Sequence, residues 1–268
     1  LEGYYDLNTI WITEKGIQEK QNLIWVDLNI LPKQGKAIGG HIVSISGDIP
    51  PGFQSSCNPN ILAEITTGEF QKKFPFSTLI YLLWLHNIEI KNDLLARLLV
   101  LHSDATWLKY QQYPENSKYW EKLLPDYNWK GLFNGVNTKG FERRIDEDLY
   151  PLFQSMQAVS GKSKLRSKHL NICSKQFQFN PDWDEDVILT LINLFGDTLG
   201  WTPPPIPSTL KSINGNRKKV PLALIKEIGI SQFLKDNRVF SYAIPSPRIF
   251  NFTSFGTVNK SPLEKKHG

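Results

Sequence analysis

Short hydrophobic groups separated by polar connectors characterise residues 4–46 of the chain. Three of these groups are rich in β-branched and aromatic residues, namely 10–12, 23–30 and 38–45. The connectors hold Lys, Gln and Gly, so the pattern predicts three strands joined as an N-terminal antiparallel β-meander. Gly39 and Gly40 stand inside the third group, where paired glycines predict a bulge or a close backbone approach.

Helical spacing is clearest in residues 75–110. Hydrophobic residues three and four positions apart share one face of a predicted first helix: Phe76, Leu79, Ile80 and Leu83. Pro75 suits the first turn of that helix. A polar link follows, and either Asn92 or Asp93 can cap a second, leucine-rich helix. We therefore predict a central helical hairpin.

The rest of the chain alternates between regular and irregular patterns. Residues 111–140 contain several Pro, Gly and Asn residues and predict loops, whereas 141–156 return to helical spacing with a kink or a helix restart at Pro151. We further predict a strand over 170–179, a helix over 182–195 and an extended connector over 196–220. A short helix over 221–228 should end at Gly229, and Ser231 should cap another. These elements predict an α+β fold.

Charge is distributed unevenly along the chain. Residues 1–150 carry 15 Lys and Arg against 18 Asp and Glu, a balance of −3, while residues 151–268 carry 16 against 8, a balance of +8. This asymmetry predicts a mildly acidic α+β region over 1–150 and a basic region over 151–268, as separate domains or as one continuous domain. A basic half favours a polyanionic partner, most often nucleic acid.

The basic half contains two dense groups of cations. The stretch 160–175 has no acidic residue and carries Lys162, Lys164, Arg166, Lys168 and Lys175; a second group holds Arg217, Lys218 and Lys219. Cations of this density neutralise phosphates and release counterions, so their number matters more than their order. The alternative is a solvated basic surface without a ligand.

Aromatic residues alternate with cations near the C-terminal end. Arg238 and Arg248 lie close in sequence to Tyr242 and Phe250, a pattern in which aromatic faces stack on unpaired bases while arginines hold the backbone. The alternative is that these aromatic side chains face the core. A structure that buries Phe250, Phe252 and Phe255 together would remove the stacking role.

Other motifs have ordinary structural explanations. Gly161, Lys162 and Ser163 lack the upstream glycine that a phosphate-binding loop needs. The acidic residues at 182–186 are better explained as a helix start than as a calcium loop. Residues 225–231 resemble the turn of a helix-turn-helix, but the following helix is short.

Glu89 and Lys91 have the spacing found in metal-dependent nucleases, where a carboxylate holds magnesium and a lysine activates water. Such a site needs an aspartate nearby, and the nearest upstream one is Asp48. An inter-helix link explains the pair more simply.

The sequence therefore predicts a non-enzymatic nucleic-acid-binding subunit of a larger ribonucleoprotein or protein–DNA complex, with other protein subunits and RNA or DNA as partners. It predicts no cofactor and no bound metal. Two cysteines, no leader segment and no bilayer-length apolar run predict a soluble, cytoplasmic protein. The alternatives are a metal-dependent nuclease and a structural interaction protein without nucleic acid.

Overall fold

The computed structural model describes residues 9–13, 24–31, 35–149, 151–152, 185–203 and 210–255. The chain divides into two compact units. Unit 1 joins residues 1–74 to residues 207–268, and unit 2 is the intervening segment 75–206. The boundary expected after Tyr150 from the charge pattern therefore falls inside unit 2. Both helices and sheets are present, and the fold is α+β.

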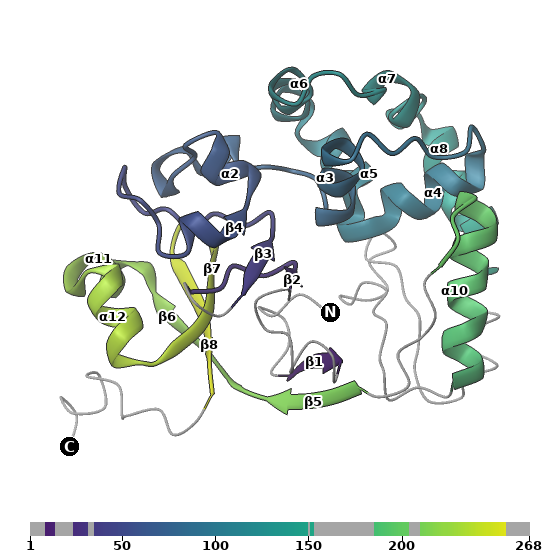
Figure 1. Ribbon diagram of the computed structural model, residues 1–268. Helices are drawn as coiled ribbons and strands as arrows, with labels where there is room; N and C mark the ends of the chain where they lie inside the picture. The colour runs from purple at the N-terminus through teal and green to yellow at the C-terminus, as the bar shows by residue number, and fades with distance from the viewer. Residues whose placement is uncertain are drawn as a thin grey trace. The chain divides into compact units, whose positions relative to one another are not determined.

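Unit 1 contains all three sheets found in the described residues (Figure 1). Its strands are β1 (Thr9–Thr13), β2 (Ile24–Val26), β3 (Lys36–Ile38), β4 (Ser56–Cys57), β5 (Leu210–Asn214), β6 (Asn216–Pro221), β7 (Val239–Ser246) and β8 (Ile249–Ser254). Its helical segments are η2 (Phe53–Ser55), α2 (Pro59–Leu62), η3 (Thr67–Lys72), α11 (Leu222–Ile228) and α12 (Ile230–Asp236).

The predicted N-terminal antiparallel meander is wrong. Strand β1 pairs with β5, which lies about two hundred residues later, while β2 pairs with β3 and β3 with β4 in parallel. The third strand, predicted over 38–45, lies earlier: β3 ends at Ile38, and within the predicted range Ile42 makes only an isolated bridge to Ile244. Hydrophobic patterning identifies strand-forming segments, but it does not identify the strand that pairs with each one.

The C-terminal sheet has the strand order β6-β8-β7 and is antiparallel. Its central strand β8 buries Phe250 and Phe252 on one face, where both rings meet Phe233 of α12 edge-to-face. Residues that alternate with them, Asn251 and Thr253, lie on the other face and are also buried. The sheet is therefore covered on both faces of β8.

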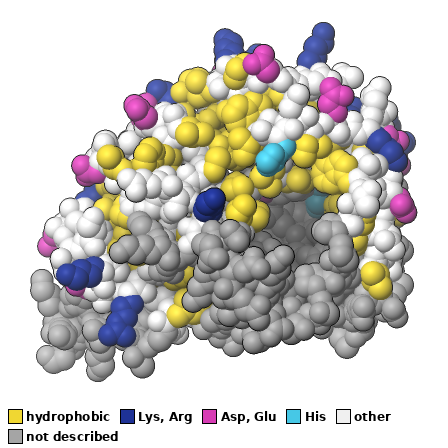
Figure 2. All heavy atoms as spheres, viewed as in Figure 1, with side chains coloured by type: hydrophobic (Ala, Val, Ile, Leu, Met, Phe, Trp, Pro, Cys, Tyr) yellow, Lys and Arg dark blue, Asp and Glu magenta, His cyan; other side chains and the backbone are white. Residues whose placement is uncertain are grey.

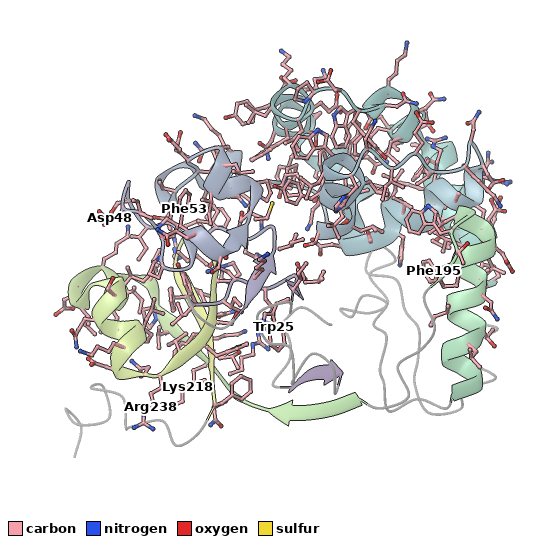
Figure 3. All side chains as sticks on the ribbon, in the orientation of Figure 1. Trp25, Asp48, Phe53, Phe195, Lys218 and Arg238 are labelled. Carbon is pink, nitrogen blue, oxygen red and sulfur yellow. The ribbon has the colours of Figure 1, made fainter. Side chains whose placement is uncertain are left out.

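A smaller core joins the two stretches of unit 1. Trp25 of β2 meets Phe240 of β7 edge-to-face, with ring centroids 5.3 Å apart (Figure 3). Phe255 packs against the same Phe240 ring. A Cβ atom on Gly39 would lie 2.8 Å from the carbonyl oxygen of Leu28, which confirms the close backbone approach predicted there.

Unit 2 is helical in its described residues (Figure 1). Its elements are α3 (Thr78–Leu85), α4 (Leu94–His102), η4 (Ser103–Ala105), α5 (Thr106–Gln112), α6 (Pro114–Leu123), α7 (Trp129–Leu132), α8 (Lys139–Arg144), the π-helical η5 (Ile145–Leu149) and α10 (Glu185–Leu199).

Helices α3 and α4 occupy the two segments predicted to be helical. Asp93 is the cap of α4, and its carboxylate accepts a hydrogen bond from the Ala96 backbone N–H at 2.9 Å. Helix α3 begins later than expected, because Ser77 caps it and Pro75 lies outside. The helix predicted after residue 182 is present as α10.

The prediction of loops over residues 111–140 is wrong, since α6, α7 and the start of α8 lie there. Pro114 is the first residue of α6, where the missing N–H costs nothing. Asn128 and Thr138 cap α7 and α8 with their side chains. The residue types that predicted loops are the ones that start these short helices.

No helix within the described ranges combines the length and the apolar character needed to cross a bilayer.

Candidate functional site

The stretch 160–175 lies outside the described residues, and so do its cations Lys162, Lys164, Arg166, Lys168 and Lys175. The predicted strand over 170–179 lies outside them as well. The described part of the basic half is residues 151–152, 185–203 and 210–255, and the last of these ranges holds the other predicted contacts.

Arg217, Lys218 and Lys219 lie on strand β6, at the edge of the C-terminal sheet. They pair across to Thr253, Phe252 and Asn251 of β8. The segment 196–220 was predicted to be an extended, exposed connector, but its residues 216–220 form a strand paired with β8. Pairing on one side leaves the opposite edge of β6 without a strand among the described residues.

The three consecutive cations do not share one face. Lys218 is opposite Phe252 and so lies on the face that α12 covers, whereas Arg217 and Lys219 project from the other face. Lys219 is exposed, and Lys218 and Arg217 are half-buried. Because β6 is an edge strand, all three cations lie next to the unpaired edge of the sheet, whichever face they project from.

Arg238 and Arg248 lie at opposite ends of the same sheet. Arg238 immediately precedes β7, has a positive φ of 49° and is exposed (Figure 3). Arg248 lies in the turn between β7 and β8, is exposed, and its carbonyl oxygen accepts a hydrogen bond from the Leu222 N–H. The two arginines therefore lie at the two ends of the sheet, and strand β8 separates β7 from the cations of β6.

Tyr242 and Phe250 do not present the exposed rings that the predicted stacking role needs, although Phe255 is only partly buried. Both side chains are completely buried, with ring centroids 5.2 Å apart and nearly parallel planes. The Tyr242 hydroxyl donates to the carbonyl oxygen of Val43, and burial raises the pKa of this phenol above its ordinary value. These rings stabilise the core of unit 1, where a nucleobase cannot reach them.

Positive charge dominates the C-terminal sheet and its two helices. Residues 210–255 contain eight Lys and Arg against two Asp and Glu, a net charge of +6. Within the described residues no acidic side chain forms a salt bridge with Lys218, Lys219, Arg238 or Arg248. On the face shown in Figure 2, Lys and Arg side chains stand apart and do not form one continuous area.

The turn that resembles a helix-turn-helix joins α11 to α12 through Gly229, which has a φ of 87°. Each helix has seven residues, and α12 buries Phe233 and Leu234. Ser231 lies inside α12 and does not cap it, contrary to expectation. Both helices use their apolar sides to pack against the sheet.

Glu89 and Lys91 lie in the link between α3 and α4, and both line a surface pocket of about 350 Å³. The Lys91 ammonium donates to the carbonyl oxygen of Asp197 at 2.6 Å. Across the described ranges, no group of three or more His, Cys, Asp and Glu side chains is placed to hold a metal ion.

Among the other residues that line this pocket, Arg97, Tyr127 and Asn128 were missed from the sequence as candidate site residues. Arg97 carried a usable signal, because it is the single charged residue within the leucine-rich helix α4. Tyr127 and Asn128 carried none, since they fall in the segment that predicted loops.

Comparison of the chain with protein-family models, with curated proteins and with solved structures gave no match.

Proposed function

We propose that the protein is a non-enzymatic nucleic-acid-binding subunit of a larger assembly, and that its basic C-terminal half grips the phosphate backbone. The observation that carries this proposal is the net charge of +6 over residues 210–255, together with four cations there, Lys218, Lys219, Arg238 and Arg248, that form no salt bridge with an acidic side chain of the described residues. Unpaired surface cations are free to exchange condensed counterions for phosphates.

The contacts proposed for unit 1 are with phosphates and not with bases. Lys218 and Lys219 lie on the edge strand β6, while Arg248 lies in the turn between β7 and β8 and Arg238 precedes β7 at the other end of the sheet. Since Tyr242 and Phe250 are buried, base stacking by these rings is no longer part of the proposal. Phosphate contacts alone fix the position of a nucleic acid without reading its sequence.

A competing explanation exists for Lys218 and Lys219. Charged side chains on an edge strand prevent edge-to-edge aggregation, and lysine is common in that role. This explanation requires no ligand. It predicts that removal of the two charges causes self-association and leaves nucleic-acid affinity unchanged.

The test is fluorescence anisotropy with labelled single-stranded RNA, single-stranded DNA and duplex DNA, each titrated over a range of salt concentrations. Each phosphate contact contributes about 0.9 to the slope of log affinity against log salt for duplex DNA, and about 0.7 for single strands. The double variant Lys218→Gln/Lys219→Gln should lower the slope by about 1.8 or about 1.4 respectively.

The matched control is Lys118→Gln/Lys122→Gln, which removes two exposed lysines from α6 in unit 2. It should keep the slope of the unaltered protein. An equal fall in both double variants would mean a general charge effect and not a site on β6. The absence of binding to all three ligands at low salt would overturn the proposal in favour of a protein-interaction subunit.

A further inference from the structure

Unit 2 contains a pocket of about 350 Å³ that the proposed nucleic-acid contacts do not use. Three elements form it: the link between α3 and α4, helix α4 itself, and the segment that leads into α7. This volume lies at the lower end of the range of about 300–1,000 Å³ that small-molecule sites occupy. A compact ligand would fill it.

Arg97 supplies a fixed cation to this pocket. Its Nε donates to the carbonyl oxygen of Leu132 at 3.2 Å, and its Nη2 donates to the carbonyl oxygen of Asn134. A guanidinium has five N–H donors, so these two bonds leave others to face a ligand. No acidic side chain of the described residues forms a salt bridge with Arg97, and burial lowers the pKa of its guanidinium.

Lys91 is a second cation on the pocket wall, and it is also held in place. Its Nζ donates to the carbonyl oxygen of Asp197 near the end of α10, and its stem runs against Gly200. Helix α10 packs against α4, with Phe195 directed toward that helix (Figure 3). An ammonium has three donors, so this bond leaves two for an anion.

Polar groups complete the wall. The Asn128 side-chain oxygen accepts a hydrogen bond from the Gly131 N–H at 3.0 Å, which leaves its amide N–H groups as donors. Any Cβ atom at position 131 would lie 2.5 Å from the Asn128 Nδ2, so glycine preserves this arrangement. Tyr127 lines the pocket as well, and its hydroxyl donates to the carbonyl oxygen of Ile88.

Glu89 is the one acidic group that lines the pocket. Burial, with a smaller contribution from the charge of Glu89, raises the pKa of Tyr127 to about 12. The lining holds two cations, Lys91 and Arg97, and one carboxylate, that of Glu89. Its net charge is therefore +1. Glu89 therefore limits the site to an occupant with one compact anionic group, and it can accept a hydrogen bond from the rest of that ligand.

We infer that this pocket binds the phosphate or carboxylate group of a small molecule between Arg97 and Lys91. Fixed charge-assisted donors are the groups that recognise such oxyanions. The inference does not depend on the proposed function, because none of these residues belongs to the C-terminal sheet.

The test is an NMR titration of the ¹⁵N-labelled full chain with inorganic phosphate at constant ionic strength. We expect saturable shifts at the backbone N–H groups of Lys91, Asn128 and Gly131. Lys91→Gln should weaken phosphate binding at least about five-fold, since it removes a charge-assisted donor. Glu89→Gln should tighten it at least about two-fold, because with bare phosphate this carboxylate only repels.

Lys130→Gln is the matched control, because Lys130 is an exposed lysine of α7 that does not line the pocket. It should leave the phosphate affinity within about two-fold. The inference is overturned if phosphate causes no saturable shift at these positions, or if Lys130→Gln and Lys91→Gln weaken binding equally. The inference is also overturned if Glu89→Gln weakens phosphate binding. This second variant is needed because Lys91 also bonds Asp197, so Lys91→Gln can disturb the end of α10.

Discussion

Glu121 shows how one buried charge affects the stability of unit 2. It lies on α6, half-buried, and burial raises the pKa of its carboxyl group above the ordinary value of 4.5. Its neighbour Tyr110 stacks on Phe133 with ring centroids 4.1 Å apart, and burial together with Glu121 raises the pKa of that phenol. The ionised carboxylate is therefore in an unfavourable environment at neutral pH.

We predict that Glu121→Gln raises the free energy of unfolding at pH 7. A carboxyl group whose pKa is raised in the folded state favours folding only while it is protonated, so its contribution is lost as pH rises above about 4.5. The gain from Glu121→Gln should grow between pH 4.5 and pH 7. Urea unfolding at several pH values measures this difference.

The control for this change is Glu147→Gln, at an exposed glutamate of η5 in the same unit. It should show no comparable growth of stability with pH. If Glu121→Gln destabilises the protein at pH 7, hydrogen bonding by Glu121 outweighs the cost of its burial.

At the scale of elements, local signals predicted helices α3, α4 and α10, but they identified neither the short helices over 111–140 nor the pairing of the strands. The Asp93 cap and the leucines of α4 lie within ten residues of one another, so the sequence contains the whole signal for that helix. Strand β1 depends on β5, and the core around Trp25 depends on Phe240. No local pattern encodes such distant partners.

In the candidate interface, the sequence could not predict which residues lie on an edge strand or which side chains are buried. Arg217, Lys218 and Lys219 read as an exposed connector, yet pairing with β8 makes them a strand. The alternation of aromatic residues with arginines is compatible with a stacking surface and with a buried sheet. The sheet is buried because Phe233 of α12 packs against Phe250. The positions of the cations were predictable, but their orientation was not.

We predict that Asp93→Ala lowers the free energy of unfolding by about 1 kcal/mol, because the first turn of α4 loses the side-chain acceptor for the Ala96 N–H. Asn92→Ala is the matched control: Asn92 is the exposed neighbour that the sequence left as the alternative cap. It should cost much less. Chemical denaturation of both variants tests this, and equal losses would show that the cap is not the cause.

At the scale of the whole molecule, unit 1 depends on both of its separate stretches. Phe240 and Ala243 of β7 belong to the same core as Trp25, Leu28 and Ile30. The backbone of Ile30 bridges Ser241, and that of Ile42 bridges Ile244. Without the second stretch, the first would expose its apolar side chains and its unpaired strand.

We predict that a chain ending at residue 206 loses the structure of unit 1 while the helices of unit 2 persist. Hydrogen exchange followed by mass spectrometry should show lost protection over residues 24–31 and retained protection over α3 and α4. Protection of residues 24–31 in the shortened chain would contradict the prediction, since it would show that the first stretch folds alone.

The insertion of unit 2 into unit 1 sets an order of events during synthesis. Residues 1–74 leave the ribosome before the strands that complete their core, and residues 75–206 must be translated in between. At roughly 5–20 residues per second, this delay is on the order of 7 to 26 seconds. The helical segment can fold in that interval, whereas Trp25 and its neighbours remain available to chaperones until the strands of the second stretch have been translated.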